Sequence, residues 1–377
     1  MYRINQTGYN QAMKTFFPPL KTPIIFVLSA LMALLGGCSE PHQNTLHLYN
    51  WSQSYPPDLI KKFERETGIR VIYDNFENND TLEAKLLLGI AGYDIVFPSA
   101  WPYFSRQAKA GIYQKLDTAK LPFLQDLDSQ IVHLLTDGKK NLTYGIPYVW
   151  GVIIFAFNTE KMAAFKDLPL DSYAAVYEPK NIKRLATCGV SFPDEALDIF
   201  PQIMRYLKTK DIDKAFERFV QLRPYIRKFE LLQSLQDLAS GSLCFSQTTL
   251  SGTHKMRRDM ITAGSPINID LRYPKEGIPI WMDVLAIPKN APHVDNAYRF
   301  INFIYRPENM AHISNYLYEF NARKGSEKYF NADMENLQKE ISTHKKNLVK
   351  ITISDRDHVR ALSQAMERII FTPTASD

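Results

Sequence analysis

The sequence predicts an α/β protein made of two lobes, with a ligand-binding cleft between them. Strand-like and helix-like segments alternate from residue 45 onward, the alternation resumes in the middle of the chain, and no low-complexity linker separates the halves. A chain of 377 residues is long enough for two domains. Without a linker, we expect the chain to cross between the lobes more than once, and ligands commonly bind in such a cleft.

The elements of the first half follow from local patterns. Thr45–Trp51 alternates in polarity like a strand, and Pro57–Thr67 has a proline near its start and Gly68 at its end, as helices do. The alternation continues with a strand over Ile69–Tyr73, a helix over Leu82–Ala91 closed by Gly92, a strand over Tyr93–Pro98 and a helix over Tyr103–Ala110. This order predicts a parallel sheet covered by helices.

The second half repeats this organisation. Apolar runs predict strands over Val152–Phe157, Val190–Phe192, Ser242–Ser246 and Trp281–Pro288. Amphipathic segments predict helices over Phe200–Lys208, Ile212–Leu222, Asn296–Tyr305 and Val359–Ile370.

Residues 1–37 are predicted to be a lipoprotein signal peptide. The uncharged stretch Ile24–Gly37 follows Lys14 and Lys21, and it is too short to span a bilayer. Small residues precede Cys38, which resembles a bacterial lipidation box, so we expect Cys38 to carry lipid and to anchor an exported, periplasmic protein. The alternative is an ordinary signal peptide that happens to contain Cys38. Translation starts at Met1 or, for a more compact signal, at Met13.

The positive charge of the chain lies partly in this signal. The formal net charge is +5, and the part after residue 37 holds 42 basic against 40 acidic residues, a net of +2. The basic residues form no run or stripe, so no nucleic-acid partner is expected, and contact with the membrane should occur only through the N-terminal lipid.

The two remaining cysteines are Cys188 and Cys244. In an oxidising compartment an even number of cysteines indicates a disulfide, and two buried free thiols are the alternative.

Motifs of enzymes and cofactor sites are absent from the sequence. It contains no GxGxxG, no GxxxxGK[ST] loop, no HExxH, no CxxC and no GxSxG, and its eight histidines have no metal-binding spacing. We therefore expect no catalytic residues, no cofactor and no metal, and we interpret the chain as a binding protein rather than an enzyme.

Several blocks of the sequence are distinctive in their order and spacing. They are LYNWS at 48–52, FERETGI at 63–69, YDIVFPS at 93–99, IPYVW at 146–150, CGVSF at 188–192, PKEG at 274–277, WMDV at 281–284 and RPE at 306–308. Together they resemble the periplasmic polyamine-binding proteins, the solute receptors of spermidine/putrescine ABC importers, and most of all their putrescine-binding members. The similarity runs from about Leu46 to about Arg368.

This resemblance implies a fold and a domain division. The family has the two-lobed fold of type II periplasmic binding proteins, which close on a ligand by a hinge, and its putrescine-binding member has a cystine at the places of Cys188 and Cys244. We expect lobe 1 to comprise residues 38–149 and 276–322, and lobe 2 to comprise residues 150–275 and 323–377. The partners implied are a polyamine ligand and the permease of an ABC importer.

The resemblance also implies a ligand site. Carboxylates should hold the ammonium groups of a polyamine, and aromatic faces should cover its methylene groups. Asp283 lies in an apolar strand, where an acid is costly without a cationic partner. The residues that match the family's ligand contacts, or could replace them, are Trp51, Ser52, Ser99, Glu195, Asp198, Trp281, Asp283 and Glu319.

The chain departs from the family at three places. Gln53 and Ser54 stand where relatives have an acid and a tyrosine, Thr249–Thr253 replaces a segment with an aromatic residue and an acid, and Glu319 replaces a tyrosine. These changes leave open which polyamine binds and how tightly. They also motivate the alternative of a receptor for a polyamine or another ligand that signals to a membrane sensor instead of feeding transport.

Overall fold

The computed structural model describes residues 44–371, apart from 53, 90–91, 137–141, 265–268 and 351–355. The predicted signal peptide, Cys38 and Gln53 therefore lie outside the described residues. The chain from Thr45 onward forms one compact unit. Within the described residues, no helix is both long and apolar enough to cross a membrane.

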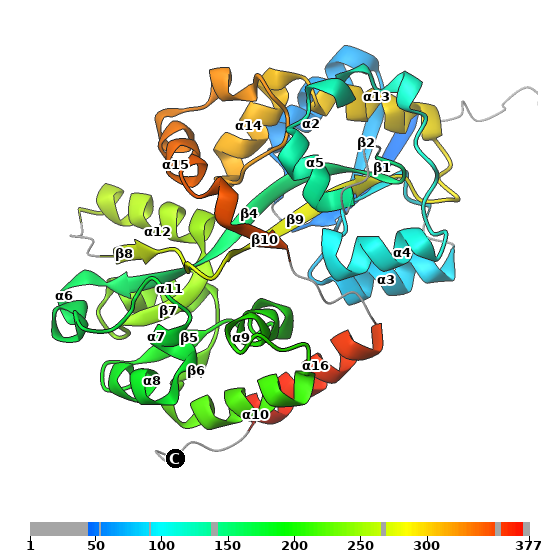
Figure 1. Cartoon of the computed structure of the whole chain (residues 1–377). Helices are drawn as coiled ribbons and strands as arrows, with labels where there is room; N and C mark the ends of the chain where they lie inside the picture. The colour runs from blue at the N-terminus through cyan, green and yellow to red at the C-terminus, as the bar shows by residue number, and fades with distance from the viewer. Residues whose placement is uncertain are drawn as a thin grey trace, which may run out of the picture. The chain divides into compact units, whose positions relative to one another are not determined.

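The described residues build a mixed sheet whose strands follow the order β2-β1-β3-β9-β4-β7-β5-β6, with β10 beside β9 and β8 beside β4 (Figure 1). The strands are β1 Thr45–Trp51, β2 Arg70–Phe76, β3 Ile95–Val96, β4 Gly145–Asn158, β5 Val190–Phe192, β6 Lys228–Phe229, β7 Phe245–Thr249, β8 Ile269–Arg272, β9 Ile278–Ala286 and β10 Leu348–Lys350.

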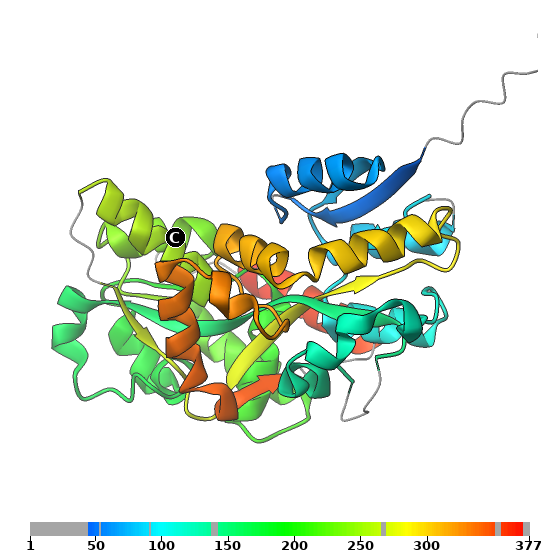
Figure 2. The ribbon, with the colours of Figure 1, turned by 90° about the horizontal axis from the view of Figure 1, so that it is seen from above.

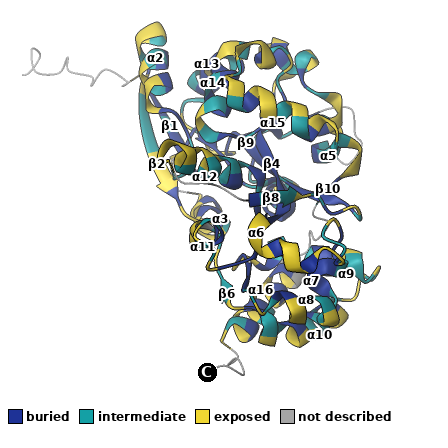
Figure 3. Cartoon of the chain, turned by 90° about the vertical axis from the view of Figure 1, so that its left-hand side faces the viewer, coloured by how far each residue is buried: buried dark blue, intermediate teal, exposed yellow. Residues whose placement is uncertain are grey.

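Helices cover this sheet, and their outward faces are exposed while β4 and β9 are buried (Figure 3). The helices are α2 Pro57–Thr67, α3 Asn79–Leu88, α4 Ser105–Lys109, α5 Ser129–Thr136, α6 Thr159–Met162, α7 Ala174–Tyr177, α8 Pro179–Leu185, α9 Phe200–Tyr206, α10 Ile212–Leu222, α11 Leu232–Ala239, α12 Leu250–Thr262, α13 Val294–Ile304, α14 Pro307–Leu317, α15 Ala332–Ser342 and α16 Arg356–Ile370. The predicted α/β fold class is thus confirmed.

The parallel arrangement predicted for the first three strands is confirmed, but the sheet as a whole is mixed. β1 runs parallel to β2 and β3, and β5 runs parallel to β6 and β7, but β4 is antiparallel to β7, β8 and β9. The antiparallel pairings centre on β4, which is 14 residues long and buried throughout. The apolar run Val152–Phe157 predicted only the second half of this strand. Strand direction depends on which distant segments pair, and local patterns do not contain that information.

The buried apolar side chains gather in two main clusters, and β4 passes from one to the other. Ile154 belongs to the first cluster and Phe155, the next residue, to the second. Helices α2, drawn in blue in Figure 2, and α13 and α14, drawn in yellow to orange, contribute to the first cluster. In that cluster, Phe63 of α2 meets Phe300 of α13 edge to face at 5.1 Å between ring centroids. The first cluster also includes Met334 of α15. The assignment of residue ranges to two lobes stays a prediction.

The helix α3 begins and ends earlier than predicted. Asn78 caps it by accepting a hydrogen bond from the Thr81 backbone N–H, and Gly89, with a φ of 67°, ends it before the expected Gly92. Either glycine could end a helix, because glycine adopts the left-handed conformation easily, and the nearer one does so here.

The predicted disulfide between Cys188 and Cys244 is present, with a Cα–Cα distance of 5.5 Å. It lies just before the parallel pairing of Val190 in β5 with Phe245 in β7. The disulfide therefore fixes the start of two neighbouring strands in the second cluster.

Candidate functional site

Asp283 is an acid in the buried strand β9, and the residue is only 8% exposed. Its Oδ1 accepts a hydrogen bond of 3.1 Å from the Ser99 hydroxyl. Asn79 at the start of α3 holds Ser99 in place, because its Oδ1 accepts from the Ser99 backbone N–H and its Nδ2 donates to the Ser99 hydroxyl. Two predicted site residues, 184 positions apart in sequence, are thus in direct contact.

Burial raises the pKa of Asp283 to about 7, while Ser99 and the Trp51 indole act in the opposite direction. The Trp51 indole N–H is itself buried and lies outside hydrogen-bond geometry to any described residue, so its effect on Asp283 is that of a nearby dipole. The Trp51 ring also packs on Phe76, with 4.6 Å between centroids. Because it is buried, the Asp283 carboxyl group is costly to ionise in the absence of a cation.

Glu319 is a second acid close to Asp283. Tyr318 ends α14 in the left-handed conformation with a φ of 60°, and Phe320 exchanges two backbone hydrogen bonds with Trp150 of β4. These two neighbours fix the position of Glu319 from both sides. Burial, and after it the charge of Asp283, raise the pKa of Glu319 well above its usual range, although its side chain is partly exposed.

Trp281 lies on β9 two residues before Asp283 and therefore on the same strand face. It pairs with Gly151 of β4, and a Cβ added at Gly151 would come within 2.5 Å of the Trp281 ring. Glycine at 151 thus makes room for the indole over the strand. The Trp281 indole N–H is buried and has no hydrogen-bond partner among the described residues.

A second group of acids lies on the 3₁₀ turn Ala196–Asp198 and its preceding residue, Glu195. The Asp198 backbone carbonyl accepts hydrogen bonds from the side-chain amides of Gln202 and Gln247, which hold this turn. Burial, and after it Glu195, raise the pKa of Asp198 to about 7. Burial, and after it the charge of Asp194, also raise the pKa of Glu195, although this residue is exposed.

Asp80 is a further acid that acts on the second group. It is a neighbour of Asn79 in α3, and its charge is one of the causes that raise the pKa of Glu195. The Tyr103 hydroxyl donates a hydrogen bond of 3.2 Å to the Asp80 carboxylate. Sequence reasoning missed Asp80, Asn79 and Tyr103, because an acid in the first turn of a helix is ordinary on its own.

Other predicted positions lie apart from these contacts. The Ser52 hydroxyl donates a hydrogen bond of 2.6 Å to the Glu77 carboxylate, and this pair is exposed.

The segment Thr249–Thr253, which departs from the family, begins the helix α12. Thr249 caps this helix by accepting from the Gly252 backbone N–H, and the Thr253 hydroxyl donates to the Thr249 carbonyl. This segment serves helix capping rather than supplying an acid or an aromatic face.

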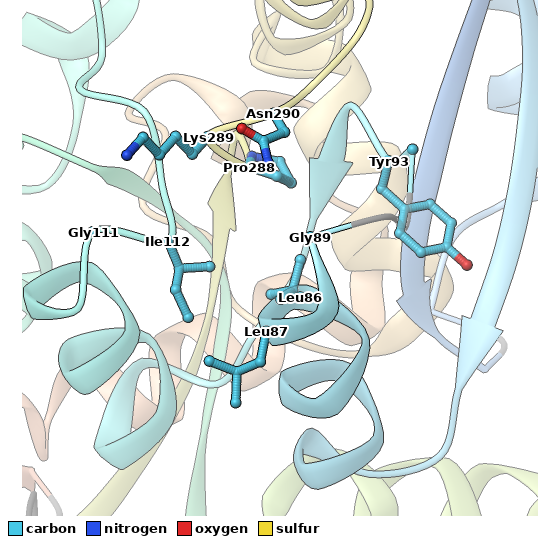
Figure 4. A pocket seen from close by; sticks show the side chains of 10 residues that line it. Leu86, Leu87, Gly89, Tyr93, Gly111, Ile112, Pro288, Lys289 and Asn290 are labelled. Carbon is cyan, nitrogen blue, oxygen red and sulfur yellow. The ribbon is translucent and has the colours of Figure 1, made fainter.

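A cavity of about 210 Å³ lies at the C-terminal end of α3, where Leu86, Leu87, Ile112 and Pro288 contribute to its wall (Figure 4). None of the predicted site residues lines it. The candidate ligand site is therefore separate from this cavity.

The two acidic groups supply carboxylates that can bind a cation. Among the described residues, no ion pair involves the carboxylates of Asp283, Glu319, Asp198 or Glu195, and no group of His, Cys, Asp and Glu has the arrangement of a metal site. Desolvated carboxylates next to aromatic rings favour an organic cation that brings its own charge and apolar surface.

Comparison with known proteins shows the family of the chain. The family described as bacterial extracellular solute-binding protein matches residues 58–340. The putrescine-binding periplasmic protein PotF of Escherichia coli K12 is 36% identical over 82% of this chain and 86% of its own, and the putrescine-binding periplasmic protein SpuD of Pseudomonas aeruginosa UCBPP-PA14 is 38% identical over 78% and 82%.

A solved structure shares the fold as well. A putative spermidine/putrescine ABC transporter protein of Listeria monocytogenes superposes with a TM-score of 0.71 at 24% identity, covering 87% of this chain and 99% of its own. These likenesses confirm the two-lobed solute-binding fold class and the prediction that the chain is not an enzyme. The chain belongs to the bacterial extracellular solute-binding proteins, within the spermidine/putrescine-binding family.

Proposed function

We propose that this protein binds a linear polyamine such as putrescine or spermidine between its two groups of acids and delivers it to an ABC importer. The observation that carries the proposal is the set of desolvated carboxylates with raised pKa values and no ion-pair partner among the described residues. Similarity to proteins named for putrescine binding supports the choice of cation.

The proposed arrangement assigns a role to every predicted residue except Ser52. Asp283 and Glu319 bind one ammonium group through charge-assisted hydrogen bonds, and Glu195 and Asp198 bind another. Trp51 and Trp281 cover the methylene groups, and Ser99 orients Asp283. Asp283 lies on a strand of the first cluster and Asp198 on a turn that packs on the second, so a bound diammonium ligand links the two.

Calorimetric titration of the purified protein tests the proposal. Putrescine, spermidine and agmatine are titrated in turn, with 1,4-butanediol as the uncharged control of the same length as putrescine. We expect saturable binding of at least one amine and no binding of the diol. Absence of heat with all three amines at millimolar concentration would contradict polyamine binding.

Polyamine affinity should rise as the pH is raised from about 6 to 8. The pKa values of Asp283 and Asp198 are raised to about 7 without ligand, and a bound cation favours their ionised form, so binding releases protons in this range. Titration in two buffers with different ionisation enthalpies measures the released protons. Affinity that is constant across this pH range, with no proton release, would show that these acids do not contact the ligand.

Delivery to an importer and attachment to the membrane are parts of the same proposal. Cys38 would carry the lipid in the periplasm, and labelling with a fatty acid that is lost in Cys38→Ser would support this. Co-purification with an ABC permease would support transport. Co-purification with a membrane sensor in its place would favour the signalling alternative, which the loss of family residues at Thr249–Thr253 motivates.

A further inference from the structure

A second cavity, of about 340 Å³, lies where β9 and β10 meet the helix α9. Its lining includes the apolar side chains Leu197, Met204 and Val349. Leu197 and Met204 pack on the second hydrophobic cluster, whereas Val349 lies on β10 next to Leu348 of the first. None of the acids of the candidate polyamine site lines this cavity.

Four basic residues line the same cavity: Arg205, Lys208, Lys210 and Lys350. Among the described residues, no ion pair to Arg205, Lys208 or Lys210 is found, whereas Arg184 and Arg218 on the neighbouring helices both pair with acids. Burial, and after it the charge of Lys109, lower the pKa of Lys350. Three of the four basic residues of this wall are therefore without an ion pair among the described residues.

Glu276, an acid close to this wall, is already engaged. It accepts hydrogen bonds from the Ser172 hydroxyl and from the Tyr173 backbone N–H, and it does not line the cavity. The Tyr173 ring does line it, and its hydroxyl donates to the Gly277 carbonyl at 2.6 Å. The carboxylate of Glu276 thus fixes the cavity wall, and no ion pair between it and Arg205 is found among the described residues.

Gly277 explains how the wall is packed. Its φ is +139°, and an added Cβ would lie 2.9 Å from Val349 and 3.4 Å from the Arg205 side chain. Glycine at this position lets the Arg205 stem and Val349 approach the turn closely. The PKEG block at 274–277, which the polyamine site does not use, therefore has a structural role in forming this cavity.

We infer that this cavity is a binding site for a phosphate-bearing organic anion, with the phosphate held by Arg205, Lys208, Lys210 and Lys350 and the organic part against Leu197, Met204 and Val349. Guanidinium and ammonium groups that line one cavity, from the end of α9 and the end of β10, offer several donors to the oxygens of one phosphate. The apolar lining suits a carbon skeleton better than a free inorganic ion. The same chemistry could come from a soluble phosphate ester or from a phospholipid headgroup.

The full-length protein is tested with two kinds of probe. Titration with glycerol 3-phosphate and with inorganic phosphate covers soluble anions, and sedimentation with phosphatidylcholine vesicles, with and without phosphatidylglycerol, covers headgroups. Saturable binding of glycerol 3-phosphate assigns the site to a soluble ester. Binding to the phosphatidylglycerol vesicles alone assigns it to a headgroup. Binding of neither overturns the proposal.

Variants show whether the binding occurs in this cavity. Arg205→Gln with Lys208→Gln should weaken the observed binding at least about tenfold, whereas the matched removal of two charges by Lys324→Gln with Lys328→Gln should change it less than about twofold. Lys208→Gly removes one cation at a backbone position with a φ of 52°, where glycine is favoured, so it should weaken binding without lowering the unfolding temperature. Equal binding by all these variants would overturn the assignment.

Discussion

Replacing Asp283 by asparagine is expected to remove most of the polyamine affinity and, at the same time, to make the ligand-free protein more stable at pH 8. Losing one partner of a buried charge pair typically costs about 2–5 kcal/mol of binding free energy, which corresponds to a loss of roughly 30-fold to several thousand-fold in affinity. The introduced amide keeps an oxygen that can accept from the Ser99 hydroxyl, so the local packing should survive.

The gain in stability follows from the direction of the pKa shift. The pKa of Asp283 is about 7 in the folded protein, above the ordinary aspartate value of the unfolded chain. The stability of the folded protein therefore carries no penalty from Asp283 below about pH 4, where the carboxyl group is protonated in both states. This advantage is lost as the pH rises through about 7 and the buried group ionises. At pH 8 the folded protein holds a desolvated carboxylate that costs up to about 4 kcal/mol, and asparagine removes this cost.

Calorimetric titration and thermal unfolding at pH 8 measure the two effects of Asp283→Asn. The control is Asp295→Asn on α13, where the carboxylate is 83% exposed and pairs with Lys120. That change should leave affinity unchanged and alter stability by less than about 0.5 kcal/mol. An Asp283→Asn variant that binds polyamine as well as the wild type, or that unfolds at a lower temperature at pH 8, would show that Asp283 plays a different role.

Removing the disulfide with Cys188→Ala and Cys244→Ala should lower the free energy of unfolding by about 4 kcal/mol. The disulfide closes a loop with a sequence separation of 56 residues, and the loss of this constraint enlarges the conformational entropy of the unfolded chain. Unfolding in urea, followed by circular dichroism, measures the change. Polyamine affinity should be retained, because the disulfide lies at the start of β5 and β7 and does not contact the acids of the site.

Reducing agent provides the control for this prediction. It should destabilise the wild type in the same direction and leave the double alanine variant unchanged. A loss of less than about 1 kcal/mol in the variant would indicate that the packing of the second cluster, rather than the covalent link, holds these strands.

Much of the fold could be predicted from local patterns. β1, α2 and α10 have the predicted bounds, because an alternating strand, a proline-started helix ended by glycine and an amphipathic helix are all encoded by neighbouring residues. The antiparallel pairing of β4 with β9 could not be predicted in this way, because it depends on contacts between segments far apart in the chain, such as Gly151 with Trp281.

The residues of the candidate site also differ in whether the sequence alone could identify them. Asp283 stood out in the sequence, because an acid inside an apolar strand needs a partner. Asp80 and Gln247 did not, since an acid in a first helical turn and a glutamine in a short strand are both ordinary. Their importance appears only when α3, the turn Ala196–Asp198 and β7 are placed together.

The sequence by itself determined the family, the types of element and the cysteine pair, and it predicted the acids and aromatic residues that we propose as a cation site. Only the tertiary structure decided which acids share an environment, that the segment at Thr249 caps a helix, and that four basic residues line a cavity beside the PKEG turn. The physical reason is the distance along the chain between the residues that interact. Helix and strand patterns arise from residues a few positions apart, whereas desolvation and the Coulomb energy of a carboxylate depend on every group that folding brings near it.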